Sequence, residues 1–335
     1  MTLRNRLITS TFAFQLVILC TVQVWFTRPA LAQWNEEEWT CMGTTCSVVL
    51  WTKNPETAVS ALRAAQEIMT EYDNELSPYK DNSLLSRINK RAHLEPIKLD
   101  DRALRILKKA KHYYEITGGA FDVTFASAGH LYDYRKAIVP SDTDLEKALD
   151  KIGSKLIYLD YEHSEVSVLE SGVKLDLGGI AKGAALDEVV KAWRKIGIEH
   201  GYVSAGGDTY FLGQHEGRPW WVGIQHPRNK GENALSVPIE NSAVSTSGDY
   251  ERFFEKSGER HHHIITPKTG RSAKGVASVT VLGKQGIDTD ALSTAVFVLG
   301  VEEGLHLINR TDGFDVIIID FEGKVYFSKG LKAPY

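Results

Sequence analysis

The sequence predicts a protein of the α+β class, with helices and strands in separate groups. Its strand candidates cluster with one another, whereas a doubly wound fold would alternate them regularly with helices. Of the 335 residues, 43% are apolar and 24% are charged, which excludes disordered, collagen-like and low-complexity proteins. The net charge is −4, so no basic surplus indicates a nucleic-acid partner.

The N-terminus has the composition of a removable export signal. Arg4 and Arg6 precede a mostly apolar run, and Ala30-Leu31-Ala32 forms a small-residue cleavage site. We therefore expect residues 1–32 to be a cleaved signal peptide and residues 33–335 to be one exported, periplasmic domain. An uncleaved membrane anchor is the alternative, which the short and interrupted apolar run disfavours.

Two cysteines remain in the mature chain, Cys41 and Cys46. If both lie on one extended strand, five steps of about 3.3 Å hold their Cα atoms too far apart for a disulfide. We expect two packed thiols, whereas a turn at Gly43 would permit the disulfide.

The first half of the mature chain contains most of the predicted helices. A strand at 46–51 precedes a long amphipathic helix, and Gly118-Gly119 follows a later helix at its C-terminal end. A second glycine pair, Gly178-Gly179, stands directly before the last helix of this half. The predicted helices are 56–72, 83–89, 101–117 and 181–196, with short strands at 155–159, 166–169 and 173–175.

The second half is mostly β. Two consecutive helices, 289–299 and 301–308, precede a closing hairpin of 316–320 and 325–328 around Glu322-Gly323. The other predicted strands are 202–204, 209–212, 220–224, 235–239, 243–245, 250–254, 262–265 and 277–282.

The start of the first of these two helices is the strongest candidate for chemistry. Asp290 and Thr294 are four residues apart and share a helical face, where a carboxylate and a hydroxyl can both bind a hard cation. Asp290 also lies in the first turn, where the helix dipole favours negative charge. The alternative is that Asp288 caps the helix and Thr294 is simply packed.

Three glycine-containing segments are weaker candidates. Gly178-Gly179 before a helix, with Lys182 close by, is typical of a phosphate site. The segment lacks both the Walker and the dinucleotide spacing, and a plain strand-to-helix turn explains the glycines equally well. Gly206-Gly207-Asp208 has a common turn composition. Gly118-Gly119-Ala120-Phe121-Asp122 follows a helix, and its first glycine has the position of a C-cap.

Three consecutive histidines, 261–263, allow two interpretations. In a strand, His261 and His263 would share one face and could bind zinc together. No further His or Cys pair has matching spacing, so one histidine acting as a general base is the more economical interpretation.

Taken in order, eight short segments resemble the ApbE family of flavin transferases, the FAD:protein FMN transferases. They extend from residue 42 to residue 295, nearly the whole mature chain. The matching segments are Met42-Gly43-Thr44-Thr45, Ser77-Pro78-Tyr79, Gly119-Ala120-Phe121-Asp122, 175–183, Gly206-Gly207-Asp208, 245–250, 263–270 and 289–295.

The resemblance implies a fold related to the T-fold, with mixed sheets, helices and a ligand cleft between two halves. It implies Mg²⁺ as cofactor, held by Asp290 and Thr294, with Gly179 and Ser293 completing the site. It implies FAD as substrate, contacted by Met42, Tyr79, Ala120, Phe121, Asp122, Asp176, Lys182, Gly206, Gly207, Asp208 and Ile264.

The implied reaction moves FMN from FAD to a threonine hydroxyl of an acceptor flavoprotein, such as a redox-pump subunit, and releases AMP. Asp290 and His263 are the catalytic candidates, and His263 would be the base that activates the hydroxyl. Four departures from the family pattern, Thr266, Ala184, Ser204 and Val123, bear on flavin contact and acceptor choice.

Two alternative functions use the same segments. An FAD pyrophosphatase would place water where the threonine attacks and would form FMN and AMP. A periplasmic flavin-binding protein would have no turnover, but the Asp290 and Thr294 pair argues against it, because a carrier does not need to polarise a pyrophosphate.

Overall fold

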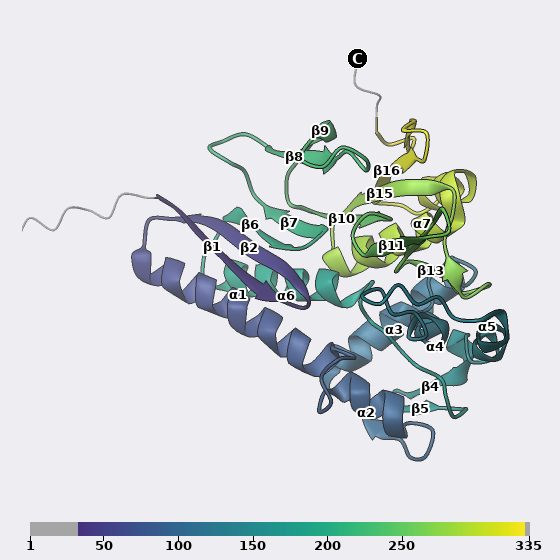
Figure 1. Ribbon diagram of the computed structural model, residues 1–335. Helices are drawn as coiled ribbons and strands as arrows, with labels where there is room; N and C mark the ends of the chain where they lie inside the picture. The colour runs from purple at the N-terminus through teal and green to yellow at the C-terminus, as the bar shows by residue number, and fades with distance from the viewer. Residues whose placement is uncertain (1–32, 332–335) are drawn as a thin grey trace, which may run out of the picture. The chain divides into compact units, whose positions relative to one another are not determined.

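The computed structural model describes residues 33–331. Its largest element is an eight-stranded sheet (Figure 1), in which every neighbouring pair is antiparallel. The α+β prediction is confirmed. The resemblance implies mixed sheets, and in this sheet all the pairings are antiparallel. The strands lie in the order β1 (Gln33–Cys41), β2 (Thr44–Thr52), β6 (His200–Ala205), β7 (Asp208–Leu212), β10 (Ser242–Gly248), β15 (Val276–Gly283), β16 (Asp315–Asp320) and β17 (Val325–Phe327).

Helices and a hairpin pack against this sheet. The helices are α1 (Pro55–Leu76), α6 (Ala181–Lys195) and α7 (Gly286–Asn309), and the hairpin is β8 (Trp220–Gln225) with β9 (Asn233–Ile239). Nearly every residue of β15 is buried, as expected for a central strand with both faces covered. The edge strand β1 instead alternates partly buried and exposed residues.

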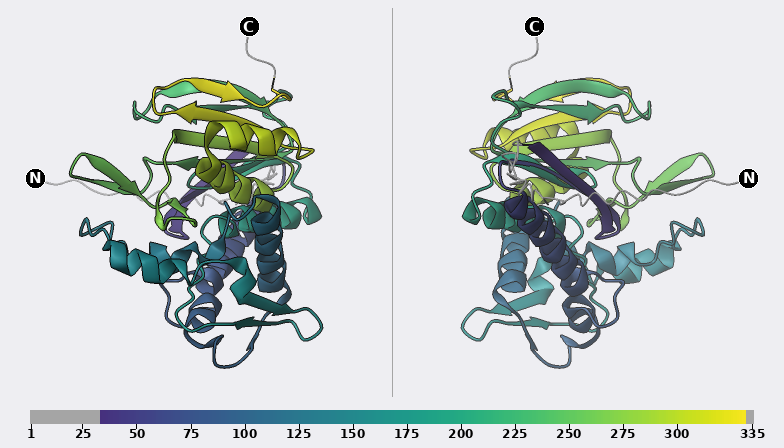
Figure 2. Two further views of the ribbon diagram at one scale, coloured as in Figure 1. Left: turned by 90° about the vertical axis from the view of Figure 1, so that its right-hand side faces the viewer. Right: turned by 90° about the vertical axis from the view of Figure 1, so that its left-hand side faces the viewer.

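A smaller group of elements lies beyond α6 and α7. Figures 1 and 2 show it on the side of these helices remote from the hairpin of β8 and β9. It comprises the sheet β3 (Ile97–Lys98), β5 (Glu165–Val168) and β4 (Ile157–Asp160), the helices α2 (Leu84–Arg91), α3 (Asp101–Ile116), α4 (Ala126–Gly129) and α5 (Asp142–Leu149), and the 3₁₀ turns Val123–Phe125 and Ser154–Leu156. Two short hairpins complete the fold, β11 (Phe253–Lys256) with β12 (Glu259–His262) and β13 (Ile265–Thr266) with β14 (Arg271–Ser272).

Helix α7 contains the break that the sequence predicts between two helices. Gly300 has φ 79° and ψ −171°, which are not helical angles. Within residues 33–331, α7 is the helix long and apolar enough to cross a membrane. In the fold it packs against β10 and β15 as a core helix, and half of its most apolar stretch is buried.

Several elements differ from the prediction for reasons of tertiary contact. β1 contains three glutamates, a residue type that strands disfavour, yet pairing with β2 makes it a strand. The predicted strand 173–175 does not form, because the Asn89 side chain binds both the N–H and the C=O of Leu175, at 2.7 and 2.9 Å. α5 is unpredicted, although Ser141 caps it by accepting from the amide of Asp144 at 3.2 Å.

The two cysteines confirm one prediction and correct its geometry. Met42 and Gly43 form the turn between β1 and β2, with φ of 52° and 71°, so Cys41 and Cys46 lie across a hairpin instead of along one strand. Both are buried free thiols. The Cys41 thiol donates to the carbonyl of Met69 at 3.3 Å, and that of Cys46 to the carbonyl of Cys41 at 3.6 Å. The predicted export signal, residues 1–32, lies outside the described residues.

Candidate active site

The glycine pair Gly178-Gly179 lies in the turn that leads into α6. The carboxylate of Asp176 accepts from the amide of Gly178 at 2.7 Å and so shapes the turn. Burial raises the pKa of Asp176. A Cβ at Gly179 would lie 3.0 Å from Oγ1 of Thr294 and 3.5 Å from the Phe121 ring. The chain therefore passes close to both predicted site residues at a position where a side chain would crowd them.

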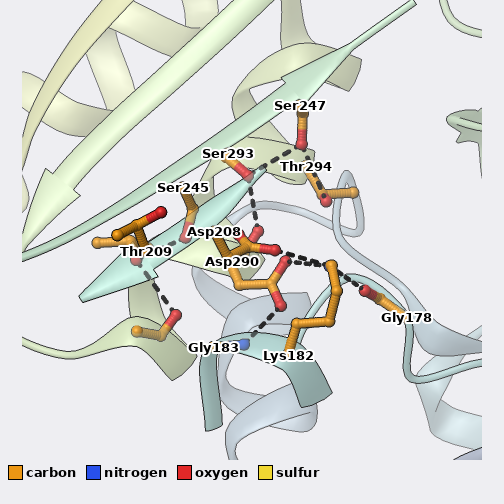
Figure 3. A network of polar contacts seen from close by, with 12 residues as sticks. Gly178, Lys182, Gly183, Asp208, Thr209, Ser245, Ser247, Asp290, Ser293 and Thr294 are labelled. Atoms are coloured by element: carbon orange, nitrogen blue, oxygen red, sulfur yellow. Dashed lines mark hydrogen bonds and ion pairs between the residues drawn. The ribbon is translucent and has the colours of Figure 1, made fainter. Parts of the chain in front are cut away.

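Lys182, in the first turn of α6, extends between two carboxylates (Figure 3). Its ammonium lies 2.9 Å from Oδ2 of Asp208 and 3.4 Å from Oδ1 of Asp290, and donates to the carbonyl of Gly178 at 2.7 Å. Burial alone would lower the pKa of Lys182, but the two carboxylates raise it, so the ammonium stays protonated. Lys182, Asp208 and Asp290, predicted from segments far apart in the sequence, thus form one cluster.

Asp290 and Asp208 are nearly inaccessible, with 3% and 2% of their surfaces exposed. The two carboxylates share the single ammonium of Lys182. Burial, and then the charge of Asp208, raise the pKa of Asp290. Its Oδ2 also accepts from the backbone amide of Gly183 at 3.1 Å. The cluster is therefore short of positive charge and suited to a cation.

Hydroxyl groups line the same side of α7 (Figure 3). Ser247, on β10, lies 2.9 Å from Oγ of Ser293 and 3.4 Å from Oγ1 of Thr294. Ser293 also donates to the carbonyl of Asp290 at 2.9 Å. Asp290 and Thr294 share the helical face that their spacing predicts. Ser247 contributes a further hydroxyl, for which the sequence predicted no individual role.

The oxygen atoms around Asp290 and Thr294 are of the types that bind a magnesium ion. Carboxylate, hydroxyl and carbonyl oxygens are what this hard cation prefers, and they surround Asp290 and Thr294 in the fold. Within residues 33–331 no three His, Cys, Asp or Glu side chains gather as a metal cluster. A cation here would therefore depend on oxygen atoms of hydroxyls, carbonyls or ligands beside the acidic side chains.

His263 is partly buried and has a free ring nitrogen. Its Nδ1 has no hydrogen-bond partner within the part of the chain that the structure describes, while its backbone amide donates to the carbonyl of Arg252 at 3.1 Å. Burial, followed by the positive charge of Arg252, lowers the pKa of His263 to about 3. The imidazole is therefore neutral near neutral pH. So low a pKa makes it a weak base in the ligand-free chain, and an anionic group bound beside it would raise the pKa.

The other two histidines of the run have different environments. The predicted continuous strand 262–265 is interrupted, because β12 ends at His262 and β13 begins at Ile265. His262 is buried, and its Nε2 lies 2.9 Å from the carbonyl of Ala273. His261 stacks on Phe254, with ring centroids 5.2 Å apart. The shared strand face for His261 and His263, the premise of the zinc interpretation, does not form.

Several predicted flavin contacts have structural partners of their own. Asp122 accepts from the amide and hydroxyl of Thr124, at 2.9 and 2.6 Å, and so caps a 3₁₀ turn. Ala120, Phe121 and Ile264 are buried, whereas Tyr79 is 82% exposed.

The turn at Gly206-Gly207 requires glycine, because Gly206 has φ 61° and neither position has room for a side chain. Cβ atoms at these two positions would lie 2.7 Å from Oγ1 of Thr44 and 2.6 Å from the carbonyl of Thr246. The roles of Gly206, Gly207 and Met42 toward FAD stay predictions.

Arg252 is a further site residue without an assigned role in the sequence-based prediction. It follows the segment 245–250, and its guanidinium donates to the carbonyl of Gly43 at 3.2 Å. Its charge also acts on both His263 and Asp176. Only the tertiary structure brings this exposed arginine to the turn that contains Met42.

Comparison with known proteins adds independent information. A family model described as the ApbE family matches residues 42–318. The chain belongs to the ApbE family. A relative from Treponema pallidum named FAD:protein FMN transferase is 32% identical, over 94% of this chain and 92% of that protein. The relative of the same name from Escherichia coli K12 is 31% identical, over 79% of this chain and 80% of that protein.

Solved ApbE structures have the same fold. The ApbE protein from Thermotoga maritima matches with a TM-score of 0.82 at 33% identity, over 89% of this chain and 98% of that chain. The flavin transferase ApbE from Vibrio cholerae matches with a TM-score of 0.80 at 28% identity and the same coverage. The predicted ApbE membership, fold class and transferase class are confirmed.

Proposed function

We propose that this ApbE-family chain is an FAD:protein FMN transferase that depends on Mg²⁺, modifies a threonine of an acceptor flavoprotein and releases AMP. The observation that carries the proposal is the cluster of one lysine, two buried carboxylates and three hydroxyls that α6, α7, β7 and β10 bring together. The names of the relatives support flavin transfer. The resemblance to the family implies acceptors such as redox-pump subunits.

The diphosphate of FAD would bind at the start of α6. The dipole at a helix N-terminus favours an anionic group, and the ammonium of Lys182 lies at the start of α6. Asp290 and Thr294, with Gly179 and Ser293, would hold Mg²⁺. When bound, this ion would neutralise charge that develops on the diphosphate.

The transfer exchanges the phosphoanhydride bond of the FAD diphosphate for a phosphoester bond to the acceptor. The threonine oxygen forms a bond to the FMN phosphorus, while the bond from that phosphorus to the bridging oxygen breaks and AMP leaves with this oxygen. The threonine proton moves to the neutral imidazole of His263. Positioning and charge stabilisation provide most of the acceleration in such transfers, and the buried charges of α6 and α7 suit that role.

The test is incubation of the chain with FAD and Mg²⁺, with and without a threonine-containing flavoprotein acceptor. We expect AMP only when the acceptor is present, and an acceptor heavier by one FMN unit. AMP and free FMN without acceptor would indicate the pyrophosphatase instead. Tight FAD binding without either product would indicate a flavin-binding protein.

The location is part of the proposal. The charge pattern and the Ala30-Leu31-Ala32 site favour export and cleavage after Ala32. The mass of the N-terminal peptide of the secreted protein tests this point. A peptide that begins at Gln33 supports export with cleavage, and a retained N-terminus contradicts cleavage after Ala32.

A further inference from the structure

α6 and α7 begin without capping side chains of their own. Ile180 and Gln285, the N-cap residues of the two helices, make no side-chain capping bond within residues 33–331. The first N–H groups of a helix have no partner inside the helix, and leaving them buried without an acceptor costs free energy. In α6 the carbonyl of Leu177 accepts from the first amide, that of Ala181, at 2.8 Å. The later amides of this turn and the first amides of α7 need acceptors from elsewhere in the fold.

Each helix receives that acceptor from the other helix. Asp187, on α6, accepts from the amides of Gly286 and Ile287 with its two carboxylate oxygens, at 2.6 and 3.0 Å. Asp290, on α7, accepts from the amide of Gly183 on α6 at 3.1 Å. The two carboxylates thus form a reciprocal clamp between the helix N-termini, and one of them belongs to the candidate metal site.

Two glycines set the distance across this clamp. A Cβ at Gly183 would lie 1.9 Å from the carbonyl oxygen of Gly286, and one at Gly286 would lie 2.5 Å from that of Gly183. The helix backbones are therefore in direct contact. With no side chain between them, a small shift of α7 changes the distance from Asp290 to Gly183 directly.

The first turn of α7 also has contacts that involve its side chains and not its backbone. Lys109, from α3, pairs with Asp288 at 2.7 Å, and Ser245 lies 2.8 Å from the hydroxyl of Thr289. Asp187 differs because it holds the backbone of the first two residues of α7. It therefore controls where that helix starts, and with it the direction of Asp290.

We infer that Asp187 is a positioning residue for the candidate metal site, and that it acts through the first turn of α7 to hold Asp290 against α6. The metal part of this inference rests on the proposed function. Asp187 itself binds backbone amides of α7, so its role is to orient Asp290 and Thr294. Residues that orient a metal ligand typically contribute 10- to 100-fold to metal affinity.

The variant Asp187→Asn keeps the shape of the side chain but removes one acceptor oxygen and the charge. Mg²⁺ binding to the chain without FAD, measured by calorimetry, should weaken by about tenfold or more. Asp187→Glu keeps the carboxylate and should retain more affinity. The control is Asn54→Ala, because Asn54 likewise accepts from two amides, those of Glu56 and Thr57 at 2.8 and 3.3 Å, at the distant start of α1. It should lower thermal stability but not Mg²⁺ affinity.

Amide hydrogen exchange without metal tests the clamp independently of the function. In Asp187→Asn, exchange should rise at the start of α6 as well as at the start of α7, whereas Asn54→Ala should change neither. If Asp187→Asn does not fold, Asp187→Glu takes its place under the same criteria. Unchanged Mg²⁺ affinity, or increased exchange confined to α7, overturns the inference. A parent chain that binds no Mg²⁺ contradicts the proposed metal site, and the exchange measurement then decides on the clamp.

Discussion

The ammonium of Lys182 lies 3.4 Å from Oδ1 of Asp290, the carboxylate assigned to the metal. Without metal, the ammonium of Lys182 thus partly neutralises the carboxylate of Asp290. Asp208 holds the same ammonium at 2.9 Å and remains its partner if Asp290 turns to a metal. Lys182 therefore serves two carboxylates in the fold, beyond the flavin contact that the resemblance implies.

Replacing Lys182 should strengthen metal binding and weaken FAD binding. A unit charge about 4 Å away contributes about 4 kcal/mol at an effective dielectric of 20, so Lys182→Met should raise the Mg²⁺ affinity of the FAD-free chain at least about tenfold. Calorimetry measures this. Lys109→Met is the matched control, because it removes a lysine that pairs with Asp288 on the same helix. Equal affinities in the parent and Lys182→Met would show that the ammonium does not compete with the metal.

Asp290 should be needed for turnover more than for flavin binding. Asp290→Ala removes the carboxylate of the candidate metal site, so AMP release should fall by at least about 10²-fold, while part of the FAD affinity remains. Product assays and fluorescence titration with FAD measure the two effects. Turnover equal to that of the parent chain would refute the assignment of Asp290 to the metal site.

Mg²⁺ affinity should rise with pH. Burial and the neighbouring charge of Asp208 raise the pKa of Asp290 above its ordinary range, so part of the metal-free population holds a proton on this carboxyl. A cation binds the ionised form and displaces that proton. Calorimetric titrations from mildly acid to mildly alkaline pH should show increasing affinity and proton release. Affinity that does not change with pH would contradict the raised pKa.

His263 should accelerate the transfer as a base. Removal of a general base costs typically 10²- to 10⁴-fold, so His263→Ala should slow FMN transfer by roughly that factor. Because the pKa of His263 is lowered to about 3, its protonation should not reduce the rate of the parent enzyme near pH 6.5, where an ordinary histidine titrates. His261→Ala, in the neighbouring half-buried histidine, is the control. Full activity of His263→Ala would exclude the base role.

The contact of Gly183 with Gly286 should make α6 intolerant of any side chain there. In Gly183→Ala the new Cβ would lie 1.9 Å from a backbone oxygen, and overpacking against backbone costs about 3 kcal/mol or more. Urea unfolding measures the loss. Gly129→Ala is the control, because its Cβ would meet only the Phe125 ring, at 3.1 Å. Similar small losses in both variants would show that the two helices can separate without cost.

Local sequence patterns predicted the features that depend on neighbouring residues. The break at Gly300 follows from one glycine within an apolar helical pattern, and its φ of 79° confirms it. The shared face of Asp290 and Thr294 follows from helical periodicity alone. Ordered motifs along residues 42–295 indicated the family, which the family model over residues 42–318 confirms.

Tertiary structure decided which distant groups meet. The amide of Gly183 binds Asp290 across 107 positions, and Asn89 binds Leu175 across 86. Neither pair has a local sequence signal, because the residue that caps a helix normally lies within a few positions of its end. The same limit hid the role of Asp187 and the lowered pKa of His263. Periodicity follows from the chain's own geometry, whereas burial, pKa and reciprocal capping depend on which segments the folded core brings into contact.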